Sequence, residues 1–251
     1  MSAGEPVLHL RGVEKRFRYR PYARGSQTLK SALIDALLGR RPPPVTVEAL
    51  RGVDLSLGPG EALGVVGRNG SGKTTLLRLA AGVYRADAGE VRVRGRRAAL
   101  LELGAGFHPE LSGWENAEIA ALAAGLTRRE HEARRGEIAA FAGLDGAMDA
   151  PLRTWSAGMA LRLGFAVATS LEPELLIVDE VLAVGDHEFQ ARCLERVAAL
   201  RAGGAALLLA SHDLSLIEAR CERAAWLDQG RTAALGPARD VCAAYRGAGG
   251  S

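Results

Sequence analysis

A glycine-rich stretch with one lysine, GRNGSGKTT, runs from Gly67 to Thr75. It fits the pattern G-x-x-x-x-G-K-[ST], in which glycines let several backbone N–H groups point at one anion. The apolar run before it (62–66) predicts a buried strand, and the run after it (76–82) predicts a helix that ends at a glycine. A glycine loop between a strand and a helix N-terminus binds phosphate well. The stretch therefore predicts a nucleoside triphosphate site.

Individual positions of this loop suit individual parts of a triphosphate. Lys73 is a compact charge that fits between the β- and γ-phosphates, where the broad planar fork of arginine would not. The chain has 32 basic residues and only three are lysines, so a lysine here stands out. Thr74 offers a hydroxyl to Mg²⁺, and Thr75 offers one to the α-phosphate. The other candidate binding residues of the loop are Gly67, Asn69, Gly70, Ser71 and Gly72.

Two carboxylates follow a second apolar run, LLIVDE, at residues 175–180. The run predicts a central strand of a parallel sheet, and ligands of such sheets bind at the carboxyl ends of the strands. Asp179 then suits Mg²⁺, and Glu180 suits a general base that polarises the attacking water. A helix cap explains such an acidic pair equally well when the pair is taken alone. Its position about 105 residues after the phosphate loop favours the catalytic interpretation.

Composition restricts the class of protein. Hydrophobic residues make up 48% and charged residues 24% of 251 residues, as in soluble globular proteins. No apolar run approaches the roughly 20 residues that a membrane-spanning helix needs, which predicts a cytosolic chain. The net charge of +3 is too small to indicate a nucleic-acid partner. The three cysteines follow no metal-ligand spacing, so we expect buried, reduced thiols.

The segment TWSAGMALRLGFAVA (154–168) resembles the signature segment of ABC-transporter nucleotide-binding domains. The family normally has Ser-Gly-Gly-Gln there, and this chain has Ser156, Ala157, Gly158 and Met159. The resemblance implies that Ser156, Gly158, Met159 and the following helix N-terminus bind the γ-phosphate of an ATP held by the opposite subunit. The helix has apolar residues on nearly every side, so we expect it to be well buried.

Further family motifs occur in the expected order. Asp186 ends VLAVGD (181–186), the segment that contacts the other subunit in the family. His212 follows a predicted strand in LLLASHD (207–213), at the position of the switch histidine that touches the γ-phosphate. Phe17 ends the predicted first strand and matches the aromatic residue that stacks on adenine. Tyr19 or Tyr22 could serve instead, and Phe17 could be an ordinary core residue.

The resemblance covers essentially the whole chain and implies an α/β fold, a P-loop NTPase of ABC type. The expected parts are a parallel-sheet core, an N-terminal antiparallel β portion and an inserted helical subdomain at about 110–165. They would form a single nucleotide-binding domain over 1–245, with a flexible tail at 246–251. The sequence has no internal repeat, so two ATP sites imply a homodimer that sandwiches ATP. A transporter would also need a separate membrane permease.

One departure from the family identifies a branch. Most members have a glutamine about 30 residues after the phosphate loop, which touches Mg²⁺ and senses the permease. This chain has LELGAGFHPELSGWEN (101–116) there, with Glu102 as the nearest polar candidate; water could fill the gap instead. The segment resembles that of ATP-binding subunits that export lipid-linked polysaccharides such as O-antigen, teichoic acid and galactan-like polymers. That branch implies a motor at the cytoplasmic face of the inner membrane.

An insertion before the second predicted strand agrees with this branch. Within it, TLKSALIDALL (28–38) places Leu29, Leu33, Ala36 and Leu37 on one helical face. This helix, at about 26–40, either covers the domain or lies at the boundary between membrane and permease. Two other functions stay open: an exporter of a drug or simple lipid, and a soluble ABC protein of translation or DNA repair. The segment 101–116 favours a glycan.

Overall fold

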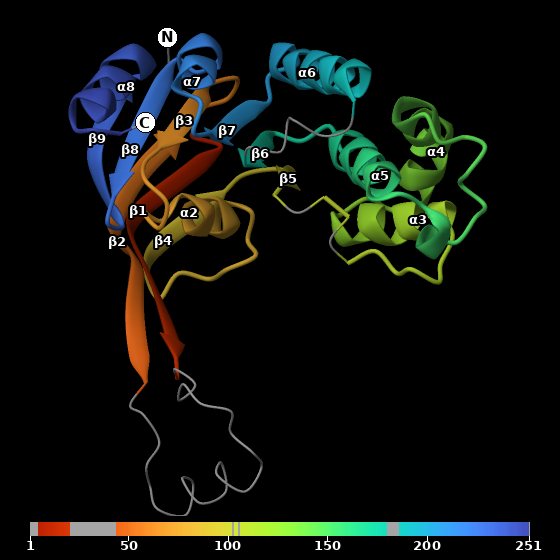
Figure 1. Ribbon diagram of the computed structural model, residues 1–251, viewed down its shortest axis with the longest axis horizontal. Coiled ribbons are helices and arrows are strands. Elements are labelled where there is room, and N and C mark those ends of the chain that lie inside the picture. Colours follow the sequence, from red (N-terminus) through yellow and green to blue (C-terminus); the bar gives the residue numbers. More distant parts are fainter. Residues whose placement is uncertain (1–4, 21–43, 102, 105, 180–185, 251) are drawn as a thin grey trace, which may run out of the picture.

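The computed structural model describes residues 5–20, 44–101, 103–104, 106–179 and 186–250. Figure 1 shows the two sheets and their helices at one end of the molecule and a helical arm at the other end. The predicted helix at 26–40, Glu102 and Glu180 lie outside the described residues. The expected α/β fold, with an antiparallel N-terminal portion and an inserted helical part, is confirmed.

The antiparallel sheet comes first along the chain. It consists, in the order β2-β1-β4, of β2 (Val45–Leu57), β1 (Leu8–Tyr19) and β4 (Ala88–Val93). β1 and β2 form a long ribbon that extends away from the core (Figure 1), and Phe17 pairs with Val47 within it. β1 continues two residues beyond Phe17, which we expected to end the strand, because the pairing with β2 runs on to Tyr19.

The core sheet has six strands in the order β5-β6-β7-β3-β8-β9. All neighbours pair in parallel except β8 and β9, which pair antiparallel. The strands are β3 (Ala62–Val66), β5 (Arg97–Leu100), β6 (Leu175–Asp179), β7 (Ala206–Ala210), β8 (Arg223–Asp228) and β9 (Arg231–Pro237). β3 and β7 are buried along their whole length, as their apolar runs predicted. The loops after β3, β6 and β7 therefore emerge at one edge.

Helices pack on both sheets. α2 (Lys73–Ala80) buries three leucines, Leu76, Leu77 and Leu79, in an apolar cluster that joins the two sheets. The remaining helices of the core are α6 (His187–Ala202), α7 (Leu214–Arg220) and α8 (Ala238–Gly247). α8 runs two residues into the segment at 246–251 that we expected to be a flexible tail, and Gly250 N–H still bonds the Tyr245 carbonyl at 3.0 Å.

The helical arm consists of α3 (Gly113–Ala123), α4 (Arg128–Ala142) and α5 (Ala157–Thr169). α3 and α4 each begin with a capping box, formed by Ser112 with Glu115 and by Thr127 with Glu130. The last helix of the arm ends at Thr169, and the predicted helical subdomain was placed at about 110–165. The expected burial of α5 holds for its second half only, from Leu163 onward. Its first half borders an open pocket, so Met159 stays partly exposed.

Two expectations from composition have a structural outcome. All three cysteines are buried and free, as predicted, and burial raises the pKa of the Cys193 and Cys221 thiols to about 12. Among the residues placed by the structure, no helix combines the length and apolar character that a bilayer crossing requires.

Candidate functional site

A pocket of about 620 Å³ lies at the edge of the core sheet where β3, β6 and β7 end. It brings together residues that are far apart in the sequence, from the antiparallel sheet, the phosphate loop and two core strands. Its lining residues are Phe17, Val47, Glu48, Ala49, Arg68, Asn69, Gly70, Gly72, Lys73, Thr74, Thr75, Leu101, Asp179 and His212.

The phosphate loop connects β3 to α2 in a form that only glycine allows at two positions. Gly67 has φ 149°, and a Cβ there would lie 2.3 Å from the Leu227 carbonyl oxygen. Gly72 has φ 110°, and a Cβ there would lie 2.6 Å from the Ala49 carbonyl oxygen. Gly72 is also the N-cap of α2, and no side chain caps this helix. A helix N-terminus without a side-chain cap is a favourable place for an anion.

Lys73 lies under this loop with 8% of its surface exposed. Its Nζ donates to the carbonyl oxygens of Gly67, at 2.6 Å, and Arg68, at 3.3 Å. These two contacts hold the ammonium group beside the helix N-terminus, at the wall of the pocket. A buried ammonium next to a helix N-terminus is suited to a polyphosphate.

Thr74 and Asp179 provide oxygen atoms at the same wall. Thr74 Oγ1 lies 3.4 Å from Asp179 Oδ2 at the end of β6. A hydroxyl and a carboxylate oxygen are hard ligands of the kind that Mg²⁺ prefers, together with phosphate oxygens and water. This pair therefore fits the predicted metal site.

The other predicted residues of the loop divide into two groups. Asn69, Gly70 and Thr75 line the pocket, as Gly72 does. Ser71 does not: it is buried beneath the loop, and its Oγ has no hydrogen-bond partner among the described residues. Gly67 does not line the pocket, and its carbonyl oxygen accepts a hydrogen bond from Lys73 Nζ.

Phe17 and His212 lie at different parts of the pocket. His212 lies two residues after the end of β7 and is exposed there. Phe17 packs edge-on against Tyr84 with ring centroids 5.4 Å apart, which fixes its ring at the wall. Tyr19, the alternative to Phe17, does not line the pocket, and Tyr22 lies outside the described residues.

Sequence reasoning missed five residues of this pocket: Val47, Glu48, Ala49, Arg68 and Leu101. Val47 and Glu48 come from the first part of β2, and Arg68 comes from the phosphate loop. Val47 could have been found from pairing, because an antiparallel partner of Phe17 must lie beside it. Arg68 occupies a variable position of the loop pattern, which carries no signal.

The signature segment forms a second pocket in the arm. Ser156 caps α5 by accepting the Met159 N–H at 3.2 Å. Ser156, Gly158 and Met159 line a pocket of about 420 Å³ together with Arg162 and the loop at 143–147. None of these residues lines the first pocket. Within one chain, the signature residues and the phosphate loop therefore belong to separate sites.

Asp186 lies beside the signature helix rather than beside the phosphate loop. It caps α6 by accepting the Phe189 N–H at 2.9 Å, and it forms an ion pair with Arg162 of α5. The Phe189 N–H and the Arg162 guanidinium hold the pKa of Asp186 below its usual range. Asp186 thus links α6 to the second pocket within this chain.

Comparison with known proteins adds independent observations. Residues 50–183 match the family model described as ABC transporter. The chain is 44% identical, over 98% of its length, to an O-antigen export system ATP-binding protein of Myxococcus xanthus, of which it spans 57%. It is 38% identical to a protein with the same description from Klebsiella pneumoniae, covering 96% of this chain and 98% of that protein. A teichoic acids export ATP-binding protein of Levilactobacillus brevis is 37% identical over 79% of this chain and is 55% covered.

Solved structures show the same fold. An ATP-binding subunit of an ABC transporter superposes with a TM-score of 0.72 at 24% identity, over 97% of this chain and 93% of the other. A dimeric ATP-binding cassette bound to ADP and Pi superposes with a TM-score of 0.68 at 19% identity, over 92% of this chain and 99% of the other. From the matching family model and the Klebsiella relative, the chain belongs to the ABC transporter family.

Proposed function

We propose that this chain is the ATP-hydrolysing subunit of an exporter that moves a lipid-linked polysaccharide across the cytoplasmic membrane. The cargo would be an O-antigen, a teichoic acid or a galactan-like polymer, and a separate permease would form the path through the membrane. The chain would act at the cytoplasmic face. The observation that supports ATP as the fuel is the pocket in which Lys73, the N-terminus of α2 and the Thr74–Asp179 pair converge.

The predicted site residues take the following roles in the proposal. The α2 N–H groups and Lys73 hold the β- and γ-phosphates, while Phe17 and Val47 contact the adenine ring. Thr74 and Asp179 hold Mg²⁺, which neutralises charge on these phosphates when it is bound. Glu180 accepts the proton of the attacking water, and His212 contacts the γ-phosphate. Glu102 is the further candidate ligand of the metal, and both Glu102 and Glu180 lie outside the described residues.

Two copies of the chain would share each ATP. The separation of the two pockets supports this, because Ser156, Gly158 and Met159 cannot line the phosphate site of their own chain in this arrangement. The N-terminus of α5 suits the γ-phosphate of a partner chain, because the positive end of a helix dipole attracts an anion. Dimeric cassettes among the similar structures agree with this arrangement.

The permease would dock between the core and the arm. A groove there is lined by Leu103, Gly104 and Phe107, which belong to the segment where most of the family has its permease-sensing glutamine. The polysaccharide cargo is supported by the names of the relatives, which describe O-antigen and teichoic acid export. This chain spans 57% of the Myxococcus protein, so the cargo of that whole protein is only proposed for this chain.

Loss of transport in living cells tests this function. Cells that depend on Lys73→Ala should accumulate the lipid-linked glycan inside, where cells with the unchanged chain export it. Arg94→Ala serves as the control, because Arg94 is exposed and lies outside the ATP pocket. Normal glycan export with Lys73→Ala would contradict the proposal. Accumulation of a drug or simple lipid instead would keep the assignment as an ATPase subunit and change the assigned cargo.

A further inference from the structure

The first turn of α6 packs into the arm. Its Phe189 is fully buried and lies edge-on against Phe141 of α4 and Phe165 of α5, with ring centroids 5.8 and 6.0 Å from its own. One turn later, Arg192 Nη1 donates to the Phe141 carbonyl oxygen at 3.2 Å. The start of α6 is therefore held by two helices of the arm.

The second half of α6 packs less closely on the core. A cavity of about 140 Å³ lies between α6, β7 and α7. Its apolar lining residues are Leu194, Val197 and Ala198 of α6, Leu207 and Leu209 of β7, and Leu216 of α7. Side chains around a cavity lose the packing contacts that would otherwise fix them. The contacts at Phe189 therefore set the position of α6 more firmly than those of its second half.

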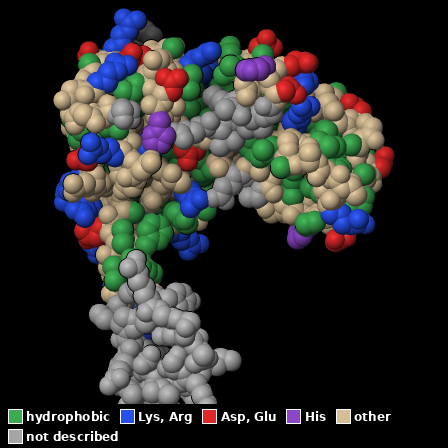
Figure 2. Space-filling model, viewed as in Figure 1, with side chains coloured by type: hydrophobic (Ala, Val, Ile, Leu, Met, Phe, Trp, Pro, Cys, Tyr) green, Lys and Arg blue, Asp and Glu red, His purple; other side chains and the backbone are tan. Residues whose placement is uncertain are grey.

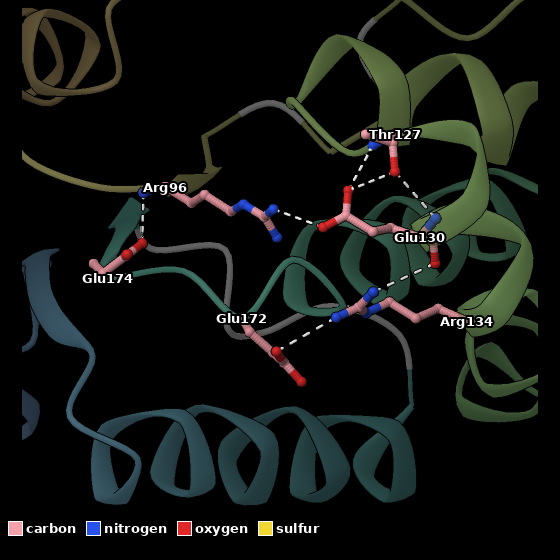
Figure 3. Close-up of polar contacts among 6 residues, drawn as sticks. All are labelled: Arg96, Thr127, Glu130, Arg134, Glu172 and Glu174. Carbon is pink, nitrogen blue, oxygen red and sulfur yellow. Dashed lines mark hydrogen bonds and ion pairs between the residues drawn. The ribbon is translucent and has the colours of Figure 1, made fainter.

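The arm is a lobe of its own, set off from the core by a notch (Figure 2). Exposed ion pairs join the two parts, as Figure 3 shows. Arg96 Nη2 lies 2.6 Å from Glu130 Oε1 of the arm, and Arg134 of the arm pairs with Glu172 at 3.4 Å. Water screens such pairs, so they hold the parts together weakly. The buried aromatic contacts fix the arm to α6 more firmly.

Phe189 contacts both members of an ion pair at the second pocket. Its backbone N–H donates to Asp186 Oδ1 at 2.9 Å, and its ring centroid lies 5.3 Å from Arg162 Cζ. A guanidinium at this distance is attracted to an aromatic ring. Arg162 pairs with Asp186 and lines the second pocket together with Ser156 and Gly158. Phe189 thus supports the wall of the second pocket from behind.

We propose that Phe189 is a positioning residue for ATP hydrolysis: it holds α5 and α6 together so that the second pocket of its chain fits the ATP of the partner chain. This rests on the proposed function, in which two chains share each ATP. Phe189 lines neither pocket, so it acts through Arg162 and Asp186. Its effect is on rate, because a misplacement of about 1 Å in a catalytic site can cost roughly a hundredfold.

Phe189→Leu tests this role in the complex purified from native membranes. We expect kcat for ATP hydrolysis to fall about tenfold or more, with KM for ATP unchanged, because the ATP pocket of the same chain stays intact. Phe165→Leu is the matched control. It removes the same atoms from the same buried cluster and leaves the Phe189 ring beside Arg162. Equal losses of kcat in the two variants, or a raised KM with unchanged kcat, would overturn the proposal.

Mixed dimers show on which ATP Phe189 acts. Two differently tagged chains, one with Phe189→Leu and one with Lys73→Ala, are produced together, and complexes with both tags are purified. They should hydrolyse ATP well above either homodimer, because one site combines an intact ATP pocket with an intact second pocket. The pair Gly158→Asp and Lys73→Ala is the reference. Recovery in the reference pair alone would overturn this proposal, and no recovery in either pair would overturn the shared site as well.

Arg162→Gln carries the same test if Phe189→Leu does not fold, because it opens no space in the aromatic cluster. It should lower kcat and recover activity when mixed with Lys73→Ala. Arg192→Gln is its control, since the Arg192 guanidinium also lies 5.3 Å from the Phe189 ring but does not line the second pocket. We expect Arg192→Gln to keep most of its activity. Equal losses from both arginine variants, or no recovery of Arg162→Gln in the mixture, would contradict the proposal.

Discussion

Thr74 Oγ1 lies 3.4 Å from Asp179 Oδ2, although 105 positions separate the two residues and the strands before them do not pair. β7 lies between β3 and β6, and all three strands run parallel. Their carboxyl ends share one edge of the sheet, so residues that follow each strand meet there. This one relationship brings the phosphate loop, the acidic strand end and His212 to a single pocket.

Lys73→Arg tests whether the shape of the cation matters as well as its charge. The Lys73 ammonium is buried and held by two carbonyl oxygens, and a guanidinium is too broad for that space. We expect the Kd for ATP to rise by roughly ten- to a hundredfold, the scale of one lost hydrogen bond to a charged group. Titration with a fluorescent ATP analogue measures this. Arg94→Lys is the control. Equal affinity of Lys73→Arg and of the unchanged protein for ATP would contradict the role given to Lys73.

Phe17→Ala and Tyr19→Ala decide which aromatic residue contacts the base. Phe17 lines the pocket, whereas Tyr19 is 53% exposed two residues farther along the ribbon. Loss of base stacking costs roughly 1 to 3 kcal/mol, so we expect Phe17→Ala to weaken ATP binding about fivefold or more. Binding of inorganic triphosphate should not change, because it has no base. A larger effect from Tyr19→Ala would transfer the role to Tyr19.

Local patterns made much of this site predictable. The strand at 62–66, the glycine loop and the helix after it are specified by neighbouring residues, and the structure has all three. Ser156 as a helix N-cap also follows from local chemistry, because its side chain bonds a backbone N–H three residues on. The end of β6 at Asp179 followed from a short apolar run that ended in acids.

Relationships between elements could not be predicted in the same way. Val47 reaches the pocket through the β1–β2 register, and the apolar signal for β2 began only at Leu50, five residues after the strand starts. Asp186 pairs with Arg162 across 24 positions because α5 and α6 pack together, which no periodicity reveals. The half-exposure of α5 likewise depends on which neighbours cover it.

Ser156→Ala separates a structural role from a role in dimerisation. Removing a helix cap costs about 1 kcal/mol of stability, and Thr127→Ala removes an equivalent cap in the same arm. Both variants should lose similar stability in urea unfolding. Only Ser156→Ala should also weaken the ATP-dependent dimer, measured by analytical ultracentrifugation in the Glu180→Gln background, which slows hydrolysis. Equal dimer affinities for the two variants would assign Ser156 a structural role alone.

Glu130→Gln tests the contribution of the Glu130 carboxylate, which bonds Thr127 in its own helix cap and Arg96 of the core, through its pH dependence. The Thr127 N–H, followed by the Arg96 guanidinium, lowers the pKa of Glu130 from 4.5 to about 2. Since the folded pKa is the lower one, ionised Glu130 stabilises the fold above pH 4.5, and this contribution is lost as the pH falls toward 2. The difference in free energy of unfolding between unchanged protein and Glu130→Gln should therefore shrink below pH 4.5.

Glu132→Gln is the control for this comparison, because Glu132 is exposed and its nearest cation, Arg135, is 3.7 Å away. We expect no comparable pH dependence from it. If Glu130→Gln and Glu132→Gln gave the same pH profile, the pairing of Glu130 with Arg96 would not contribute to holding the arm.

The central claim, that two chains complete each ATP site, is tested most directly by mixing two inactive variants. Lys73→Ala removes the phosphate contact and leaves the signature segment intact. Gly158→Asp does the reverse, and it fits its own chain, because a Cβ there would meet only Ser156 Oγ at 3.8 Å. Each variant alone should hydrolyse almost no ATP with its permease, and the mixture should regain clear activity from mixed dimers with one intact site. A mixture as inactive as its parts, or full activity of Gly158→Asp alone, would contradict a site shared between chains.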